Sequence, residues 1–592
     1  MFEMSTNSEK LKALLLLILL VIVALFDMAG VASIMPFMAV LADPGIANEN
    51  RILASIVSNI SFVNEQNLMF VLGSATLCII ILSLIFKASV SYIQIRFVLM
   101  QEFSISSRLV ERYLYQKYSW FLERNSAELG KNILSEIQVI MSNAATPLLH
   151  LIAHGFVSFA LIMLLVSIDF NLAMNVVLIL GAAYFILYFF VRGTLKKAGG
   201  KRHKANQERF HIVSELFRAI REVKMSRMEH TYNSRFKNSA RGYAENQSAA
   251  RAIAQLPRYF IEGIAFSGMI TLILYLLKTR GEFFEIIPII SLYAFAGYRL
   301  LPALQQIYAS ITQLRFIGPT VEALADEIAN LKMKEKEISE DLLMLKKEIT
   351  FNDVSFNYEA STKAAILKAS FVLKFGSFTG IVGKTGSGKS TLVDLLLGLL
   401  EPQAGTVSVD GRVLGQKNYR SWQSQIGYVP QSVHLIDDTV TRNIAFGLDD
   451  KDVDHNALRK AAKLACALEF ITKELPEGFE TRVGERGSRL SGGQMQRISI
   501  ARALYRNPSI VVLDEATSAL DVVTERAVLA ELSCNLNGLT LIMITHRLST
   551  VANCNQVLHV QDGIVKNVSP SFLNKIENSK DTNSKKDYQN NV

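Results

Sequence analysis

The sequence of 592 residues is poor in the residue types that hold small secreted domains and zinc sites together. It has four cysteines, at positions 78, 466, 534 and 554, and no two of them are separated by only two residues. Disulfide scaffolds and tetrahedral zinc sites need paired cysteines, or cysteines with histidines, at short and regular spacing. The sequence therefore argues against both and favours four ordinary thiols.

Charge is scarce as well, and it is almost missing from long stretches of the N-terminal half. Charged residues make up 19% of the chain. About 20 apolar residues are needed to cross a bilayer as a helix. Runs of that length lie at about 11–41, 68–100, 146–168, 172–191, 253–277 and 284–311. We therefore expect an all-α membrane domain of six helices over residues 1–317, whose first run is too long to be a signal peptide.

The net charge of +9 could by itself indicate a nucleic-acid surface, an anionic membrane surface or an anionic ligand. The excess of lysine and arginine lies in the hydrophobic half, where residues 192–251 contain 15 basic and five acidic residues. The positive-inside rule places that stretch in the cytoplasm. Because the number of spans is even, both termini are expected there too. This accounts for the charge without a nucleic-acid partner.

Several connecting segments have distinct patterns. The helical pattern continues beyond the membrane through 104–136 and 196–250, which predicts two cytoplasmic hairpins with tips near 123–131 and 224–235. Residues 51–62 have apolar residues at helical spacing and predict a helix on the outer surface. Residues 318–348 are charged and helix-prone, so we expect a helical connector. Residues 574–592 are polar without periodicity and are expected to be disordered.

The segment 349–573 has the pattern of an α/β domain. A short apolar strand at 378–382 leads directly into the glycine-rich loop GKTGSGKST at 383–391, and a helical run follows. Strand, glycine loop and helix form the context that a P-loop requires, because loop N–H groups and the helix N-terminus bind phosphate oxygens. We therefore expect ATP and Mg²⁺, with Lys389 at the β/γ-phosphates and Ser390 at the metal. The candidate loop residues are Gly383, Thr385, Gly386, Ser387, Gly388, Lys389, Ser390 and Thr391.

Further candidates follow two other apolar strands. Asp514 and Glu515 come after the strand 510–513. The aspartate fits the carboxylate on the Mg²⁺ side of a P-loop site, and the glutamate fits a group that polarises the attacking water. His546 follows the strand 541–545 and could contact the γ-phosphate. A histidine alone would more often be structural, so its assignment depends on the other motifs.

Taken in order, these motifs resemble the ATPase domain of ABC transporters. The set comprises Tyr358, the loop 383–391, Gln431 in YVPQ, LSGGQ at 490–494, Asp514-Glu515, SALD at 518–521 and THR around His546. The resemblance implies that Tyr358 stacks on adenine and that Gln431 links Mg²⁺ and water to the membrane domain. It also implies that Glu515 is the catalytic base. By the same resemblance Ser491 and Gly493 bind the γ-phosphate of an ATP held on the opposite subunit, and Gly492, Gln494 and Asp521 are further candidate ATP-binding residues.

The domain order, six spans and then one ATPase domain, resembles that of half-transporters with the type IV exporter fold. Since such ATPase domains act in pairs, the resemblance implies a homodimer of this chain. Membrane segments at 32–43, 256–266 and 296–304 are similar to PglK-type flippases of lipid-linked oligosaccharides. That similarity implies a bacterial inner-membrane protein that moves an anionic polyprenyl-pyrophosphate-linked oligosaccharide from the inner to the outer leaflet.

Three cations within the predicted spans are the candidate substrate residues. Lys87, Arg258 and Arg299 lie 19, 20 and 18 residues inward from the predicted outer ends of their spans. They therefore share one level, where a basic ring could receive an anionic headgroup. Two alternatives remain open: the cations snorkel to membrane lipid headgroups, or Asp27 and Glu262 neutralise them.

The function also has alternatives at this stage. A lipid or multidrug exporter would need an apolar cavity and would depend little on the three cations. A channel or regulator that uses ATP only for gating belongs to a different class. The intact Glu515 argues against that class, because gating by binding alone needs no catalytic base.

Overall fold

The computed structural model describes residues 6–42, 65–280, 283–331, 343–358, 363–534, 538–545 and 551–569. The chain forms two compact units. The first comprises Met1–Gln116 with Glu123–Lys334, and the second comprises Lys117–Leu122 with Glu335–Val592. Residues 117–122 therefore belong to the C-terminal unit, although they lie between two helices of the first unit in the sequence.

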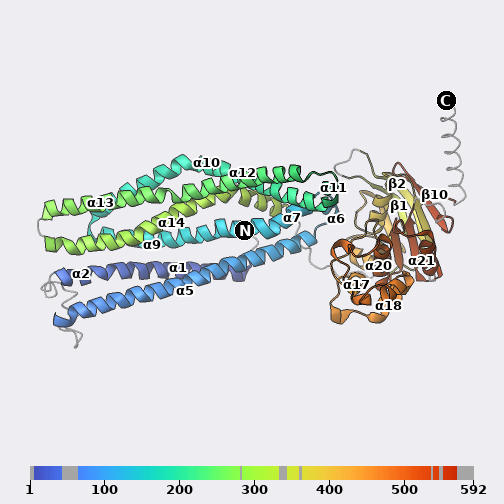
Figure 1. Cartoon of the computed structure of the whole chain (residues 1–592), viewed down its shortest axis with the longest axis horizontal. Coiled ribbons are helices and arrows are strands. Elements are labelled where there is room, and N and C mark those ends of the chain that lie inside the picture. Colours follow the sequence, from blue (N-terminus) through green and yellow to red (C-terminus); the bar gives the residue numbers. More distant parts are fainter. Residues whose placement is uncertain are drawn as a thin grey trace, which may run out of the picture. The chain divides into compact units, whose positions relative to one another are not determined.

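The described part of the first unit is helical. Its longer helices are α1 (Asn7–Ala32), α2 (Ile34–Ala42), α5 (Glu65–Leu114), α9 (Thr146–Ile168), α10 (Phe170–Arg218), α12 (Glu229–Gln255), α13 (Pro257–Arg280) and α14 (Phe283–Ala329). Its short ones are α7 (Ser126–Lys131), α8 (Ile137–Ile140), α11 (Ile220–Met225) and the π-helical turns η2 (Asn132–Glu136) and η3 (Met141–Ala145). The long helices run side by side, and α14 packs against α9, α10, α12 and α13 (Figure 1).

Helices are present at all six positions where spans were expected. Among the described residues, four helical stretches are long and apolar enough to cross a membrane: Asn7–Leu41, Asn67–Leu114, Ser126–Ile168 and Phe170–Arg218. Helices α13 and α14 occupy the fifth and sixth positions and are joined at 281–282, outside the described residues. The predicted outer-surface helix at 51–62, part of the connector and the predicted tail also lie outside the described residues.

The first cytoplasmic hairpin turns earlier than the sequence suggested. Helix α5 ends at Leu114, the short helix α6 (Tyr118–Leu122) follows, and α7 begins at Ser126. The side chain of Asn125 accepts a hydrogen bond from the backbone N–H of Ala127 at 2.9 Å. This N-cap starts the returning helix inside the range 123–131, which was expected to be the tip. The second hairpin turns between α11 and α12, within the expected range.

Among the described residues, three groups of buried apolar side chains hold the membrane helices together. One lies where α1, α9, α10 and α14 meet and includes the fully buried Leu161, Leu292 and Ala296. Another joins α1, α5 and α9 around Leu16 and Leu20, and the third joins α10, α12 and α14. Many other large apolar side chains of these helices are exposed. That distribution is expected for helices whose outer faces contact lipid.

The second unit contains two sheets. The strands are β1 (Glu348–Phe356), β2 (Ile366–Lys374), β3 (Phe378–Val382), β4 (Ala404–Val409), β5 (Arg412–Val413), β6 (Ile426–Val429), β7 (Ile510–Asp514), β8 (Thr540–Ile544), β9 (Gln556–Gln561) and β10 (Ile564–Val568). A four-stranded antiparallel sheet has the order β2-β1-β4-β5, and a six-stranded sheet has the order β10-β9-β3-β8-β7-β6. In the larger sheet only the edge strand β10 is antiparallel.

Helices and short 3₁₀ turns complete this unit. Besides α6, they are α15 (Lys389–Leu396), α16 (Tyr419–Gln423), α17 (Val440–Ile444), α18 (His455–Leu464), α19 (Leu468–Lys473), α20 (Gly492–Tyr505), α21 (Val522–Cys534), η4 (Asp450–Asp452), η5 (Gly478–Glu480) and η6 (Glu485–Gly487). Strands β3, β7 and β8 are buried throughout, as the continuous apolar runs of a covered parallel sheet require. Because β8 lies between β3 and β7, the segments after β3 and β7 leave the same edge of the sheet.

Candidate functional site

The glycine loop after β3 has a backbone conformation that residues other than glycine rarely adopt. Gly386 and Gly388 have φ values of +78° and +108°. A Cβ atom at residue 388 would lie 2.4 Å from the carbonyl oxygen of Ala365, so close backbone packing also requires glycine there. Helix α15 begins at the next residue. The loop therefore ends at a helix N-terminus, as the strand–loop–helix pattern predicted.

The side chain of Lys389 folds back over the loop. Its Nζ atom donates to the carbonyl oxygens of Gly383 at 3.0 Å and Lys384 at 2.9 Å. Burial lowers the pKa of Lys389, while the carboxylates of Glu515 and Asp514 act in the opposite direction. The ammonium group is thus held at the loop beside the two carboxylates that the sequence analysis assigned to the same site.

One polar atom in the loop supports a fit to phosphate. The Oγ atom of Ser387 is buried and has no hydrogen-bond partner among the described residues. Buried hydroxyl groups usually find a partner. Lys384, Thr385 and Gly386 are exposed at the tip of the loop. The described residues therefore fit a triphosphate chain, with Lys389, Ser390 and Thr391 as the side chains that would hold it.

Asp514 and Glu515 occupy two different environments at the end of β7. Asp514 is buried and accepts a hydrogen bond from Tyr428 Oη at 3.3 Å. Burial raises the pKa of Asp514, and Glu515 adds to that shift, whereas Tyr428 and Lys389 oppose it. Tyr428 was not among the residues predicted from the sequence, although it lies in the same YVPQ segment as Gln431.

Glu515 is held by its backbone as well as by its side chain. It has a left-handed φ of +48°, and its backbone N–H donates to the carbonyl of Ile544 at 3.1 Å. The Nε2 atom of Gln431 donates to Glu515 Oε2 at 2.7 Å. The structure thus brings together two of the three residues expected to be catalytic. The third, His546, lies outside the described residues.

Tyr358 lies beside the start of α15. Its hydroxyl group is 3.1 Å from Thr391 Oγ1, and its ring contacts Phe356 edge-on with 5.1 Å between ring centroids. The residue expected to stack on adenine is therefore next to the helix that begins at the glycine loop.

The LSGGQ segment opens α20 with a capping box. Ser491 Oγ accepts from the N–H of Gln494 at 3.2 Å, and Gln494 Oε1 accepts from the N–H of Ser491 at 3.0 Å. Gln494 Nε2 also donates to Glu474. These two predicted ATP contacts therefore have a local structural role, which the Ser-x-x-Gln spacing could have indicated. Gly492 and Gly493 form the first turn of the helix.

Asp521 caps the next helix in a similar way. Its carboxylate accepts from the backbone N–H of Thr524 at 3.0 Å and from its hydroxyl at 2.6 Å, and these bonds lower the pKa of Asp521. Gln496, buried inside α20, joins the two segments through the N–H of Ala519 at 3.1 Å and Ser518 Oγ at 3.4 Å. Gln496 was not among the residues predicted from the sequence.

In the first unit, two of the three predicted substrate cations meet at one carboxylate. Lys87 of α5 binds Asp27 Oδ2 at 3.2 Å, and Arg299 of α14 binds Asp27 Oδ1 at 3.0 Å. Asp27, on α1, is 1% exposed and also accepts from Ser83 at 3.1 Å. Pairing with Asp27, one of the alternatives left open by the sequence, is therefore present in the structure, although one carboxylate offsets only one of the two positive charges.

Arg258 is held separately. Its Nε atom is 2.6 Å from Glu262 Oε1, one turn along the same helix α13. Gln305 of α14 also reaches Glu262, at 3.5 Å. The three cations lie at a similar distance along their predicted spans, but they form three ion pairs with two different carboxylates, Asp27 and Glu262.

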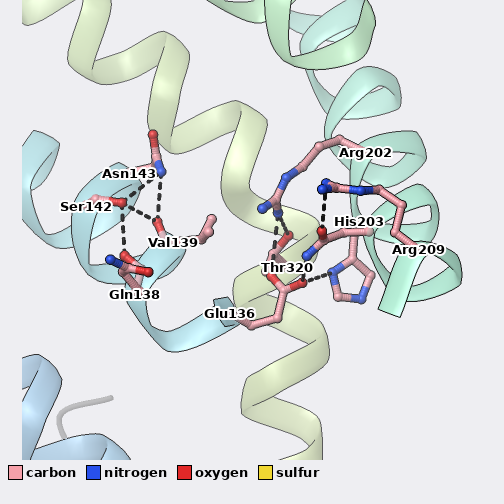
Figure 2. Close-up of polar contacts among 10 residues, drawn as sticks. Glu136, Gln138, Val139, Ser142, Asn143, Arg202, His203, Arg209 and Thr320 are labelled. Carbon is pink, nitrogen blue, oxygen red and sulfur yellow. Dashed lines mark hydrogen bonds and ion pairs between the residues drawn. The ribbon is translucent and has the colours of Figure 1, made fainter. Parts of the chain in front are cut away.

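A second buried ion pair lies in the helices that extend beyond the predicted spans. Arg202 of α10 is 3.5 Å from Glu136 of η2, and both side chains are 1% exposed (Figure 2). Asn206 donates to Glu136 at 2.8 Å, and Arg202 also donates to Thr320 of α14 at 3.3 Å. Figure 2 shows these side chains converging from three helical segments. This network was not predicted from the sequence.

The arrangement as a whole defines an ATPase domain attached to a membrane domain, and comparison with known proteins agrees. The family model described as ABC transporter matches residues 366–518, and the one described as ABC transporter transmembrane region matches 13–282. The chain belongs to the ABC transporter family. It is a multi-pass membrane protein whose nucleotide-binding domain hydrolyses ATP coupled to transport, and the expected fold class is confirmed.

Particular relatives extend this comparison. A Methylococcus capsulatus protein named ATP-dependent lipid A-core flippase is 31% identical over 549 residues, which cover 91% of this chain and 88% of that protein. A Desulfotalea psychrophila protein of the same name is 31% identical over 470 residues, covering 78% and 80%. The structure of a bacterial Atm1-family ABC exporter with ATP bound matches with a TM-score of 0.76 and 23% identity, over 94% of this chain and 95% of that one. The last similarity shows the exporter fold.

Proposed function

We propose that this chain is an ATP-driven flippase that moves an anionic amphipathic lipid from the inner to the outer leaflet of a bacterial inner membrane. The substrate class we favour is a polyprenyl-pyrophosphate-linked oligosaccharide. The relatives named as lipid A-core flippases support a lipid as cargo. The pyrophosphate is inferred from the charges of the membrane helices.

The meeting of Lys87 and Arg299 at Asp27 carries this proposal. Two cations from different helices share one buried carboxylate, so the cluster keeps one net positive charge. The Lys87 and Arg299 side chains are 41% and 21% exposed, which leaves part of each accessible to a ligand. Charged groups within membrane spans are costly and usually mark a functional site. A pyrophosphate offers several oxygens to such a pair, and the guanidinium fork is suited to bind two of them.

In the nucleotide domain, the proposed roles follow the positions already described. Ser390, Asp514 and Gln431 would hold Mg²⁺, which neutralises phosphate charge when bound. Glu515 would take a proton from the attacking water, since its carboxylate is fixed by Gln431 at 2.7 Å and by a strained backbone. His546 would contact the γ-phosphate, and Tyr358 would stack on adenine.

The working unit in this proposal is a homodimer. Ser491 and Gly493 lie at the N-terminus of α20, where backbone N–H groups suit an anion. In a head-to-tail pair they would contact ATP bound to the glycine loop of the partner subunit, together with Gly492, Gln494 and Asp521. Both termini and the nucleotide domain would lie in the cytoplasm, as the 15 basic residues of 192–251 indicate.

A second candidate function is a flippase for a different lipid, one with little or no phosphate in its headgroup. The pairing of Arg258 with Glu262 favours it, because this cation is already neutralised on its own helix. In that case apolar contacts alone would select the cargo, and the headgroup charge would matter little.

A reconstituted translocation assay distinguishes the two candidate functions. The full chain in proteoliposomes would be given a fluorescent lipid-linked oligosaccharide with a pyrophosphate, the same glycan on a neutral linkage, and a lipid A-core glycolipid. We expect ATP-dependent movement of the pyrophosphate lipid, none by the Glu515→Gln variant, and slow movement of the neutral form. Equal rates for wild type and Glu515→Gln would refute ATP-driven transport, and equal rates for charged and neutral lipids would favour the second candidate.

A further inference from the structure

We propose that Asp27 is an internal counterion that competes with the headgroup of the cargo for Lys87 and Arg299, and so sets the affinity of the membrane site for anions. This inference rests on the proposed function, because it concerns the same site. It assigns a role to a carboxylate that is not itself expected to touch the cargo.

The geometry matches that of a bound anion. Each carboxylate oxygen of Asp27 takes one cation: Oδ2 binds Lys87 at 3.2 Å and Oδ1 binds Arg299 at 3.0 Å. Ser83 adds a third donor to Oδ1 at 3.1 Å. The two cations come from α5 and α14, while the carboxylate comes from α1. Two cations and a hydroxyl group converging on one anion form the donor set that a phosphate would also need.

The counterion Asp27 differs in solvent exposure from the two cations that it binds. Asp27 is 1% exposed, whereas the Lys87 and Arg299 side chains are 41% and 21% exposed. A ligand can therefore reach the cations while the carboxylate stays covered. Water screens the buried Asp27 carboxylate only weakly, so its contact with the less exposed Arg299 is stronger than that of a surface ion pair. An arriving anion must weaken these contacts before it gains the full attraction of the cations.

This competition would suit a transport cycle. A site with two free cations would hold a pyrophosphate tightly and release it slowly. A carboxylate that returns to the cations when the helices move replaces part of the charge of the departing headgroup, so the empty site does not hold two unpaired cations. Asp27 would thus act as a specificity-determining residue that lowers affinity in favour of turnover.

The pair Arg258–Glu262 provides a matched control. It has the same chemistry, with 2.6 Å between Nε and Oε1, but both residues lie on α13 and the Arg258 side chain is 61% exposed. Glu262 binds a single cation in the described structure. Removing its charge should therefore have a smaller effect on an anion bound at Lys87 and Arg299.

The test measures binding of a polyprenyl pyrophosphate and of the neutral polyprenol to the full chain in nanodiscs. We expect Asp27→Asn to lower the Kd for the pyrophosphate lipid about tenfold. An effect of this size is expected when one negative charge near the bound anion is removed and water partly screens the interaction. Binding of the polyprenol should not change, and Glu262→Gln should change neither Kd by more than about twofold. Inorganic pyrophosphate, added as a competitor, distinguishes recognition of the headgroup from recognition of the whole lipid.

A second pair of variants keeps the inference testable should Asp27→Asn alone fold poorly. Lys87→Gln leaves Arg299 fully neutralised by Asp27, so it should bind the pyrophosphate lipid weakly. Lys87→Gln combined with Asp27→Asn frees Arg299 and should bind more tightly than Lys87→Gln alone. A double variant that binds no more tightly than Lys87→Gln, or a folded Asp27→Asn with unchanged Kd, would overturn the role of Asp27. If the wild-type chain does not translocate the lipid but these differences in Kd are observed, only the proposed function is refuted.

Discussion

The glycine loop of the nucleotide unit and the ion pairs of the membrane unit are positioned in different ways. In the nucleotide unit, the loop 383–388 and Lys389 are positioned by the backbone of one short segment, and Lys389 bonds to carbonyls five and six residues away. In the membrane unit, Asp27 meets partners 60 and 272 residues away, and Glu136 meets Arg202 at a separation of 66 residues. A local motif thus carries its own geometry, whereas a long-range ion pair depends on how whole helices pack.

The largest effect is expected at Glu515, the proposed catalytic carboxylate of the nucleotide unit. Replacing Glu515 by Gln keeps its size and its contact with Gln431 but removes the base, so the ATPase rate should fall about 10²- to 10⁴-fold. ATP affinity should stay within about threefold, because the loop is untouched. Phosphate release and nucleotide binding measure the two quantities. Glu469→Gln, an exposed change far from the loop in sequence, should retain the wild-type rate. Hydrolysis by Glu515→Gln at the wild-type rate would remove Glu515 from the mechanism.

The long-range network of the membrane unit should show its importance in stability. Arg202→Met leaves Glu136 buried without its cation, which typically costs about 3–5 kcal/mol. Unfolding of the full chain in detergent, followed by circular dichroism against temperature, should show a clearly lower midpoint. Arg241→Ala, which breaks an exposed ion pair with Glu245, should leave the midpoint unchanged.

A double variant makes this prediction more specific. Arg202→Met with Glu136→Gln removes both charges, so much of the lost stability should return. If Arg202→Met alone costs no more than Arg241→Ala, the buried network has no special role, and the contrast between local and long-range sites would be weakened.

Within the nucleotide unit, two glycines of one loop should behave differently. Gly388→Ala forces a strained backbone and brings a Cβ to 2.4 Å from the Ala365 carbonyl, so it should cost about 2 kcal/mol or more and impair ATP binding. At Gly386 the φ is +78° but a Cβ meets no described atom within 4 Å, so alanine should cost about 1 kcal/mol. Thermal unfolding and ATP titration of both variants test the difference. Equal losses would show that close packing at residue 388 is unimportant.

The smallest effect is a pH-dependent one on α15. Burial, with a further contribution from Asp514, raises the pKa of Asp394 to about 6. The folded protein therefore holds the proton of Asp394 more tightly than the unfolded chain does. As the pH rises from about 4 to about 6, the folded protein loses this contribution to its stability. Asp394→Asn should therefore stabilise the nucleotide unit at pH 8 by on the order of 1 kcal/mol, after allowance for partial exposure, and have little effect at pH 4. An equal gain at both pH values would point to packing rather than charge.

The same contrast explains what could be predicted from the sequence. Six helical runs, the strand–loop–helix of the P-loop and the carboxylates after β7 were visible because each depends on a contiguous pattern. The choice between free and neutralised cations at Lys87 and Arg299 was not, since it depends on the packing of α1, α5 and α14. The network of Glu136 and Arg202 was missed for the same reason. The turn of the first hairpin was misplaced because the cap at Asn125 is a single-residue signal.

The central claim is that the charges at Lys87 and Arg299 are linked to ATP-driven movement of an anionic lipid. The most direct test compares translocation of a pyrophosphate-linked and a neutral lipid by wild type, Arg299→Gln and the control Arg241→Gln in the same vesicles. The account predicts that Arg299→Gln slows the pyrophosphate lipid about tenfold or more and leaves the neutral lipid unchanged, while Arg241→Gln matches wild type. Equal slowing of both lipids by Arg299→Gln, or no slowing of either, would contradict it.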